Sequence, residues 1–158
     1  MDLPEQFFYL LFQLERHLER GLELVLAELD LTPLRWRTLQ IIRRIEDCSM
    51  SDLAQFSTID RTTLTRSIDR LVADRLIERC AHKKDRRVVV LRLTETGQAF
   101  NERAVKAVFA YNRRNLAAIP ADRRRELVRA MTALLSDLIA DPDELTDILR
   151  FDKAARDG

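Results

Sequence analysis

The chain has 158 residues, of which 46% are apolar and 34% are charged, and only three are glycines and four are prolines. This composition excludes a disordered chain, and the scarcity of turn-forming residues excludes a β-rich fold, so we expect one mainly helical domain over residues 1–158. The net charge of +1 excludes a generally basic protein, although the basic residues are not evenly spread.

Residues 4–29 are predicted to form a helix, because apolar side chains recur there every three or four positions. Additional apolar residues lie on other sides of its first turns. A helix that is apolar all round must be covered on all sides, so its start is predicted to pack against a second chain. The alternative is the end of an ordinary core helix. The stripe and the additional residues are Phe7, Leu11, Leu14, Leu18, Leu22, Val25 and Leu29, with Phe8, Leu10 and Phe12.

Three helix starts follow in the sequence. Thr32 precedes Pro33 and is predicted to cap a second helix. Ser49 and Asp52 have the spacing of a capping box, which would open a third helix. Asp60 is predicted to cap a fourth helix, over residues 60–73. One face of that helix is apolar, with Leu64, Ile68, Leu71 and Val72.

Residues 77–82 and 87–93 alternate in polarity like the strands of a hairpin around a basic turn. We expect Val89, Leu91 and Leu93 to face the core. After the hairpin, a long helix is predicted from Thr94 to about Ile119, and another over residues 122–140.

The two helices over 50–56 and 60–73, joined by a tight turn, are predicted to form a helix-turn-helix. Opposite the apolar face of its second helix are Arg61, Thr62, Thr65, Arg66 and Asp69. Of these, the two arginines and the two threonines are candidates for contact with bases or nearby phosphates, and Arg70 is a candidate for a phosphate. The alternative is that the arginines form an ordinary solvated helix face.

The hairpin tip adds Lys83, Lys84, Arg86 and Arg87, so residues 61–92 hold ten basic and four acidic side chains. Asp85 lies two residues before Arg87 and is predicted to pair with its guanidinium, which would orient that group for a DNA minor groove. The alternative is a turn that is merely soluble.

These residues resemble the MarR family of winged-helix transcription regulators. Residues 85–97 are similar to its D-x-R-x-x-x-L-x-L-T-x-x-G signature, and the stretch from Asp60 to Arg66 is similar to its helix-turn-helix. Three positions depart from the family pattern. Thr58 stands where a glycine often occupies the turn, and Ser57 stands where a leucine is usual. Arg75 replaces a common glycine, which would strain the backbone if its φ is positive.

The resemblance implies a winged helix-turn-helix lobe over 32–94 and a helical dimerisation region over 4–29 and 95–151. It also implies a homodimer that binds a near-palindromic operator in double-stranded DNA, usually as a repressor, with Arg87 or Arg86 in the minor groove and Asp85 as the brace. With Ser51 in the third helix, the candidate DNA contacts are Ser51, Arg61, Thr62, Thr65, Arg66, Arg70, Lys83, Lys84, Asp85, Arg86 and Arg87.

Members of the family often release DNA when a small aromatic or anionic effector binds beside the winged lobe. By position, Arg16, His17 and Trp36 are the candidates to line such a site. The alternatives are that Trp36 belongs to the core and that His17 is a hydrated surface group. Cys48 and Cys80 lack metal-ligand spacing and are expected to be structural, so we expect neither a metal nor a cofactor.

The sequence therefore predicts a sequence-specific DNA-binding regulator. A winged-helix module that binds another protein and does not read DNA is the alternative, but such a module would be expected to lose the cations that are concentrated here. An enzyme is not expected, because the chain has two histidines, no recognisable nucleophile motif and no glycine-rich phosphate loop. No apolar run approaches the roughly 18 residues of a membrane span, so a cytoplasmic protein is expected.

Overall fold

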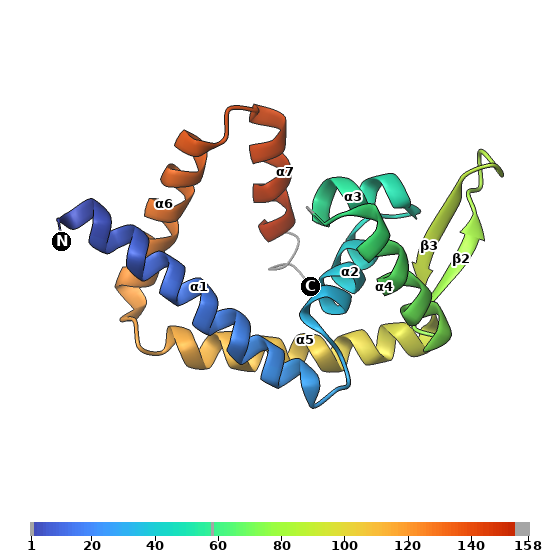
Figure 1. The fold of residues 1–158 in the computed structure, drawn as a ribbon, viewed down its shortest axis with the longest axis horizontal. Helices are drawn as coiled ribbons and strands as arrows, with labels where there is room; N and C mark the ends of the chain where they lie inside the picture. The colour runs from blue at the N-terminus through green and yellow to red at the C-terminus, as the bar shows by residue number, and fades with distance from the viewer. Residues whose placement is uncertain (1, 58, 154–158) are drawn as a thin grey trace. The chain divides into compact units, whose positions relative to one another are not determined.

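The computed structural model describes residues 2–57 and 59–153 and is mainly helical, with one small antiparallel sheet (Figure 1). The expected fold class is therefore confirmed. The chain divides into two compact units, Met1–Tyr111 and Asn112–Gly158. The first unit holds α1 (Leu3–Ala27), α2 (Pro33–Arg44), β1 (Cys48–Ser49), α3 (Met50–Ser57), α4 (Arg61–Ala73), β2 (Ile77–Ala81), β3 (Val89–Leu93) and most of α5 (Glu95–Leu116). The second unit holds α6 (Ala121–Leu138) and α7 (Pro142–Lys153).

Local capping bonds fix the starts of two helices in the first unit. The Thr32 hydroxyl accepts the backbone N–H of Arg35 at 3.3 Å where α2 begins. The Asp60 carboxylate accepts the backbone N–H of Thr63 at 2.9 Å where α4 begins. Each bond satisfies an N–H that has no partner within its own helix, and both predicted starts are confirmed.

The core of the first unit is built on the apolar face of α4. Leu64, Ile68 and Leu71 are fully buried, together with Leu39 of α2 and Leu53 of α3. The stripe predicted for the fourth helix is thus confirmed at these three positions, whereas Val72 is half-buried. Burial of this face fixes which side of α4 remains exposed.

The strands form a sheet in the order β1-β3-β2, so β3 is the central strand. Val90 and Leu91 are both buried, at 0% and 1% exposure. Successive strand residues point to opposite faces, so β3 is covered on both faces. The alternation expected for Val89, Leu91 and Leu93 is therefore wrong at Val89, which is 50% exposed.

Arg75 follows the end of α4 in the left-handed region, with a φ of 59°. The N–H of the next residue, Leu76, donates to the carbonyl oxygen of Leu71 at 2.9 Å, which closes the last turn of the helix. The φ of Arg75 is thus positive. Because arginine has a Cβ, this left-handed conformation costs some strain that a glycine would not have.

Gly97 lies where α5 passes the backbone of Leu76. A Cβ at this glycine would lie 1.8 Å from the Leu76 carbonyl oxygen. That same oxygen accepts the backbone N–H of Thr94 at 3.1 Å, and the Thr94 hydroxyl accepts the N–H of Gly97 at 2.9 Å. Only a glycine allows this close approach, which joins the residues that follow α4 to the start of α5.

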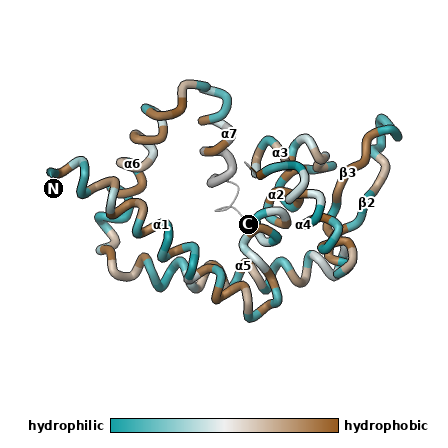
Figure 2. The backbone as a smooth tube through the Cα atoms, viewed as in Figure 1, coloured by the Kyte–Doolittle hydropathy of each residue, from teal (hydrophilic) through white to brown (hydrophobic). Residues whose placement is uncertain are grey.

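Each unit exposes apolar side chains on a helix. In the first unit they lie along α1, whose alternating hydropathy is visible in Figure 2, and include Phe7, Phe8, Tyr9, Leu10, Phe12 and Leu14. In the second unit α6 has no buried residue and exposes Leu127, Val128, Met131, Leu135 and Leu138. Exposed apolar surface of this extent on a folded chain indicates a binding partner.

Candidate nucleic-acid interface

The exposed side of α4 carries the residues that the sequence singles out for DNA contact. Arg61, Thr62, Thr65, Arg66 and Asp69 are all exposed on the side opposite the buried leucines, and we call this set the reading face. The Thr65 hydroxyl donates its proton to the carbonyl oxygen of Arg61 at 2.8 Å, so its oxygen is left to act as an acceptor. The structure therefore brings the four candidate contacts together on one surface.

The residue that caps α4 is an ionised carboxylate. Hydrogen bonds from Thr63 lower the pKa of Asp60, so this cap stays ionised at neutral pH. The exposed Asp60 carboxylate accepts the backbone N–H of Thr63, so its charge lies at the N-terminus of α4, where the helix dipole stabilises it.

A reciprocal capping box opens α3, as the sequence predicts. Asp52 Oδ2 accepts the backbone N–H of Ser49 at 2.7 Å, and the Ser49 hydroxyl accepts the N–H of Asp52 at 3.2 Å. Ser51, a candidate DNA contact, is exposed in this first turn of α3. Thr58, where the family often has a glycine, lies outside the described residues.

The hairpin tip lies at the end of the β2–β3 arm (Figure 1) and is hydrophilic (Figure 2), and residues 83–87 are exposed. The imidazole Nδ1 of His82 accepts the backbone N–H groups of Lys84 and Asp85, each at 3.2 Å. The sequence gives no local signal for this contact, which folds the basic tip over a histidine. The five candidate residues of the tip, Lys83, Lys84, Asp85, Arg86 and Arg87, are all exposed.

Asp85 holds Arg87 by its backbone N–H and not by its guanidinium. Its Oδ1 accepts the N–H of Arg87 at 3.0 Å, whereas the expected partner was the guanidinium. A two-residue spacing in a turn brings a short carboxylate to the following backbone N–H more readily than to the end of a long side chain. The Arg87 guanidinium therefore projects from a backbone that Asp85 holds in place.

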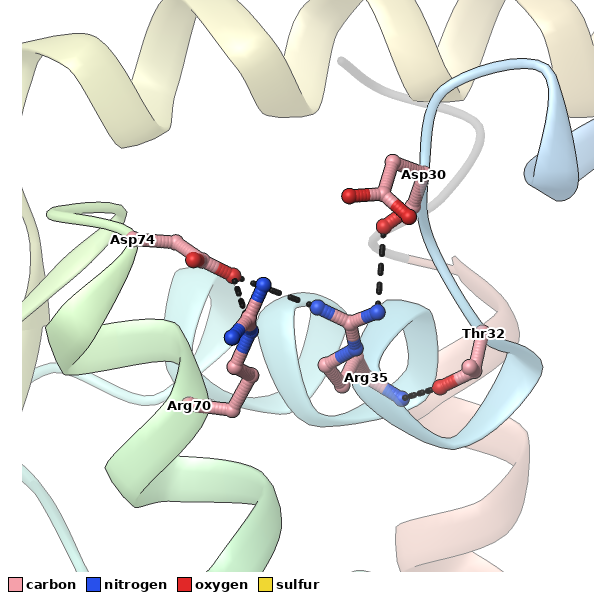
Figure 3. A network of polar contacts seen from close by, with 5 residues as sticks. All are labelled: Asp30, Thr32, Arg35, Arg70 and Asp74. Atoms are coloured by element: carbon pink, nitrogen blue, oxygen red, sulfur yellow. Dashed lines mark hydrogen bonds and ion pairs between the residues drawn. The ribbon is translucent and has the colours of Figure 1, made fainter.

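Arg70, the candidate phosphate contact, lies in the polar network of Figure 3. Its Nε is 3.2 Å from Oδ2 of Asp74, and the same oxygen is 3.2 Å from Nη1 of Arg35. Arg35 also donates from Nη2 to the carbonyl oxygen of Asp30 at 3.0 Å. One carboxylate thus holds an arginine of α2 and an arginine of α4, and it links the turn before α2 to the end of α4.

The candidate effector residues lie on two helices of the first unit. Arg16 and His17 are exposed on α1, and Trp36 is half-buried on α2. A cavity of about 460 Å³ lies elsewhere in the first unit, lined by Ile42, Asp47, Leu91, Arg92 and Asn101 among others, and none of the three candidates lines it.

The thiols are held in their protonated forms. Burial raises the pKa of Cys48 in β1 to about 12, and burial with the nearby charge of Glu78 raises the pKa of Cys80 in β2. Thiolates are the reactive and metal-binding form, so neither environment promotes such chemistry. Among the described residues, no group of three or more histidine, cysteine, aspartate or glutamate side chains could hold a metal ion.

No helix in the described part of the chain is both long and apolar enough to span a membrane.

Comparison with known proteins gives consistent matches. A family model described as MarR family matches residues 31–89. The chain is 31% identical over 111 residues to the homoprotocatechuate degradative operon repressor of Escherichia coli, which covers 70% of this chain and 72% of the relative. It is 25% identical over 137 residues to the HTH-type transcriptional repressor IacR of Pseudomonas putida, which covers 87% of this chain and 80% of the relative.

Two solved structures agree in fold. Wild-type MarR from E. coli in its apo form superposes with a TM-score of 0.72 at 26% identity, covering 85% of this chain and 98% of that chain. A mutant of the same protein in complex with operator DNA superposes with a TM-score of 0.72 at 27% identity, covering 85% and 99%.

Proposed function

This chain belongs to the MarR family of transcription regulators, and we propose that it acts as a homodimer that represses transcription by binding a near-palindromic operator. The family consists of DNA-binding regulators and not of enzymes. Relatives of this chain are named as repressors, and a similar structure holds operator DNA. These likenesses support repression by direct binding to double-stranded DNA.

The observation that carries the proposal is the exposure of two cationic surfaces that follow each other in the chain. The reading face of α4 presents arginine and threonine side chains, which suit guanine and thymine edges in a major groove. The hairpin tip presents lysines and arginines, and an arginine there suits a narrow minor groove. The proposed contacts are Ser51, Arg61, Thr62, Thr65, Arg66, Arg70, Lys83, Lys84, Asp85, Arg86 and Arg87, with Asp85 acting through Arg87.

A homodimer is supported by the exposed apolar side chains on α1 and, separately, on α6. Association of two chains would remove these surfaces from water, which is the main driving force for stable dimers. We propose that 4–29 and 95–151 form the dimerisation region and 32–94 the DNA-binding lobe of one domain over 1–158. Two copies of α4 would then enter successive major grooves.

We also propose that a small aromatic or anionic effector regulates binding at a site that includes Arg16, His17 and Trp36. A cation and an imidazole on α1 suit a carboxylate, and the Trp36 ring on α2 suits an aromatic group. Because the proposed partner is chromosomal DNA, we place the protein in the cytoplasm.

Selection of bound duplexes from a random pool tests the proposal. A dimer that reads two half-sites should enrich an inverted repeat whose halves lie about 10 bp apart, centre to centre. Failure to enrich any sequence would contradict it and would favour a winged-helix module that binds proteins.

A further inference from the structure

Asp69 places a carboxylate at the C-terminal end of the reading face. With 3.6 residues per turn, it lies one turn beyond Thr65 and Arg66 and two turns beyond Thr62. Its side chain is 58% exposed. A carboxylate that faces DNA repels the phosphates unless a cation neutralises it.

Arg79 of β2 supplies that cation. Its Nη2 lies 2.5 Å from Oδ1 of Asp69. The strand register places Arg79 opposite Leu91, so the two side chains leave the sheet on the same face, and Leu91 is buried there. The bond to Asp69 shows that this face of β2 directs Arg79 toward α4.

The contact orients a side chain more than it stabilises the fold. The Arg79 side chain is 44% exposed, so solvent screening leaves the pair with little effect on the free energy of folding. A guanidinium has five N–H donors, and the described residues engage this one only through Asp69. Its remaining donors lie beside the reading face.

We propose that Arg79 binds a DNA backbone phosphate and that Asp69 is a positioning residue that orients its guanidinium. The inference rests on the proposed DNA binding and adds to it a cation from β2, outside both the helix-turn-helix and the hairpin tip. A phosphate is the partner because the early residues of a recognition helix reach bases. Asp69 lies in the later half of α4, where such a helix leaves the groove and meets the backbone.

The salt dependence of binding to a random-sequence duplex tests the phosphate contact. Arg79→Ala should reduce the slope of log affinity against log salt by about 0.9, the value for one phosphate contact. The ratio of wild-type to variant affinity should then shrink roughly 3.5-fold as salt rises from about 50 to about 200 mM. Arg79→Lys should keep the wild-type slope because it keeps the charge.

Arg37 offers a matched control. It pairs with Glu19 at 2.6 Å between α2 and α1, with side-chain exposures of 51% and 43%, and it lies on neither cationic surface. Arg37→Ala removes the same charge from a similar pair and should leave the slope unchanged. An Arg79→Ala slope equal to that of Arg37→Ala and of wild type would overturn the inference.

Asp69→Asn separates a phosphate contact from simple neutralisation of Asp69. In the Arg79→Ala background it should recover part of the lost affinity by removing the exposed carboxylate, while the slope stays reduced. Complete recovery of both affinity and slope would show that Arg79 only neutralises Asp69, and would overturn the inference.

Asp69→Asn alone tests the positioning role. It should keep the wild-type slope and lower the ratio of affinities for a selected operator and a random duplex, because the guanidinium is no longer held in one orientation. Glu19→Gln is the control and should not change the ratio. An unchanged ratio in Asp69→Asn would remove Asp69 from the inference. A wild-type protein without any salt-dependent duplex binding would instead refute the proposed function itself.

Discussion

Gly97→Ala should destabilise the protein, although the same change in an ordinary helix would stabilise it. The new Cβ would lie 1.8 Å from the Leu76 oxygen and 2.7 Å from its carbonyl carbon, and real Cβ contacts are essentially never shorter than 3.0 Å. The backbone segments must therefore separate by more than 1 Å, which disrupts the 3.1 Å bond from the Thr94 N–H to the Leu76 oxygen.

The magnitudes decide the sign of this change. Forcing a methyl group into a packed site costs about 1–3 kcal/mol, and loss of the hydrogen bond costs about 1 kcal/mol. The better helix propensity of alanine returns at most about 1 kcal/mol. The net loss is about 1–3 kcal/mol, which for a chain of this size lowers Tm by roughly 2–4 °C per kcal/mol.

Urea unfolding followed by circular dichroism, at one fixed protein concentration, measures this loss. Thr96→Ala is the control, because Thr96 is exposed in the same turn of α5 and its substitution should change stability by less than about 0.5 kcal/mol. A Gly97→Ala variant as stable as this control would refute the close approach of α5 to Leu76.

Three further predictions concern conformation, pH and thiol reactivity. Arg75→Gly should raise stability by up to about 1 kcal/mol in urea unfolding, since relief of the left-handed strain outweighs the extra entropy of an unfolded glycine; destabilisation would contradict this. The pKa of Asp60 is lowered in the folded protein by Thr63, so its contribution is present above the unfolded pKa of about 3.9 and is lost as pH falls through the lower folded value. Asp60→Asn keeps the cap and should lose less stability than wild type below roughly pH 4; equal losses would argue against the shift. A thiol reagent should label half-buried Cys80 before buried Cys48, and rapid labelling of Cys48 in the folded protein would refute its burial.

Sequence reasoning succeeds here where the physics is local. The caps at Thr32 and Asp60 and the box between Ser49 and Asp52 join residues three apart, so their spacing alone predicts them. The exposed side of α4 follows in the same way from the period of its buried side. From these local features the sequence predicts the helix-turn-helix and most of the proposed DNA contacts.

Contacts between elements could not be predicted from spacing. Val90 is buried together with Leu91 because both faces of the central strand β3 are covered, and its central place depends on pairing with the distant strand β1. The bond between Asp69 and Arg79 needs β2 to lie beside α4. Arg92 and Asp47, 45 residues apart in the sequence, pair only after the sheet has formed.

At the hairpin tip the sequence predicts one feature and misses another. The proximity of Asp85 to Arg87 is local and is predicted, but the choice of the backbone N–H over the guanidinium depends on the turn conformation. That conformation is set in part by His82, whose ring accepts two backbone N–H groups of the tip. A residue adjacent to the basic cluster thus shapes it without contributing to its charge pattern.

Hydroxyl-radical protection of a selected duplex, compared between wild type and Arg87→Ala, tests the central claim most directly. Two recognition helices with flanking wings should protect two blocks about one helical turn apart, each bordered by a minor-groove protection that Arg87→Ala removes. A single protected block, or wing protections that persist without the Arg87 guanidinium, would contradict the account.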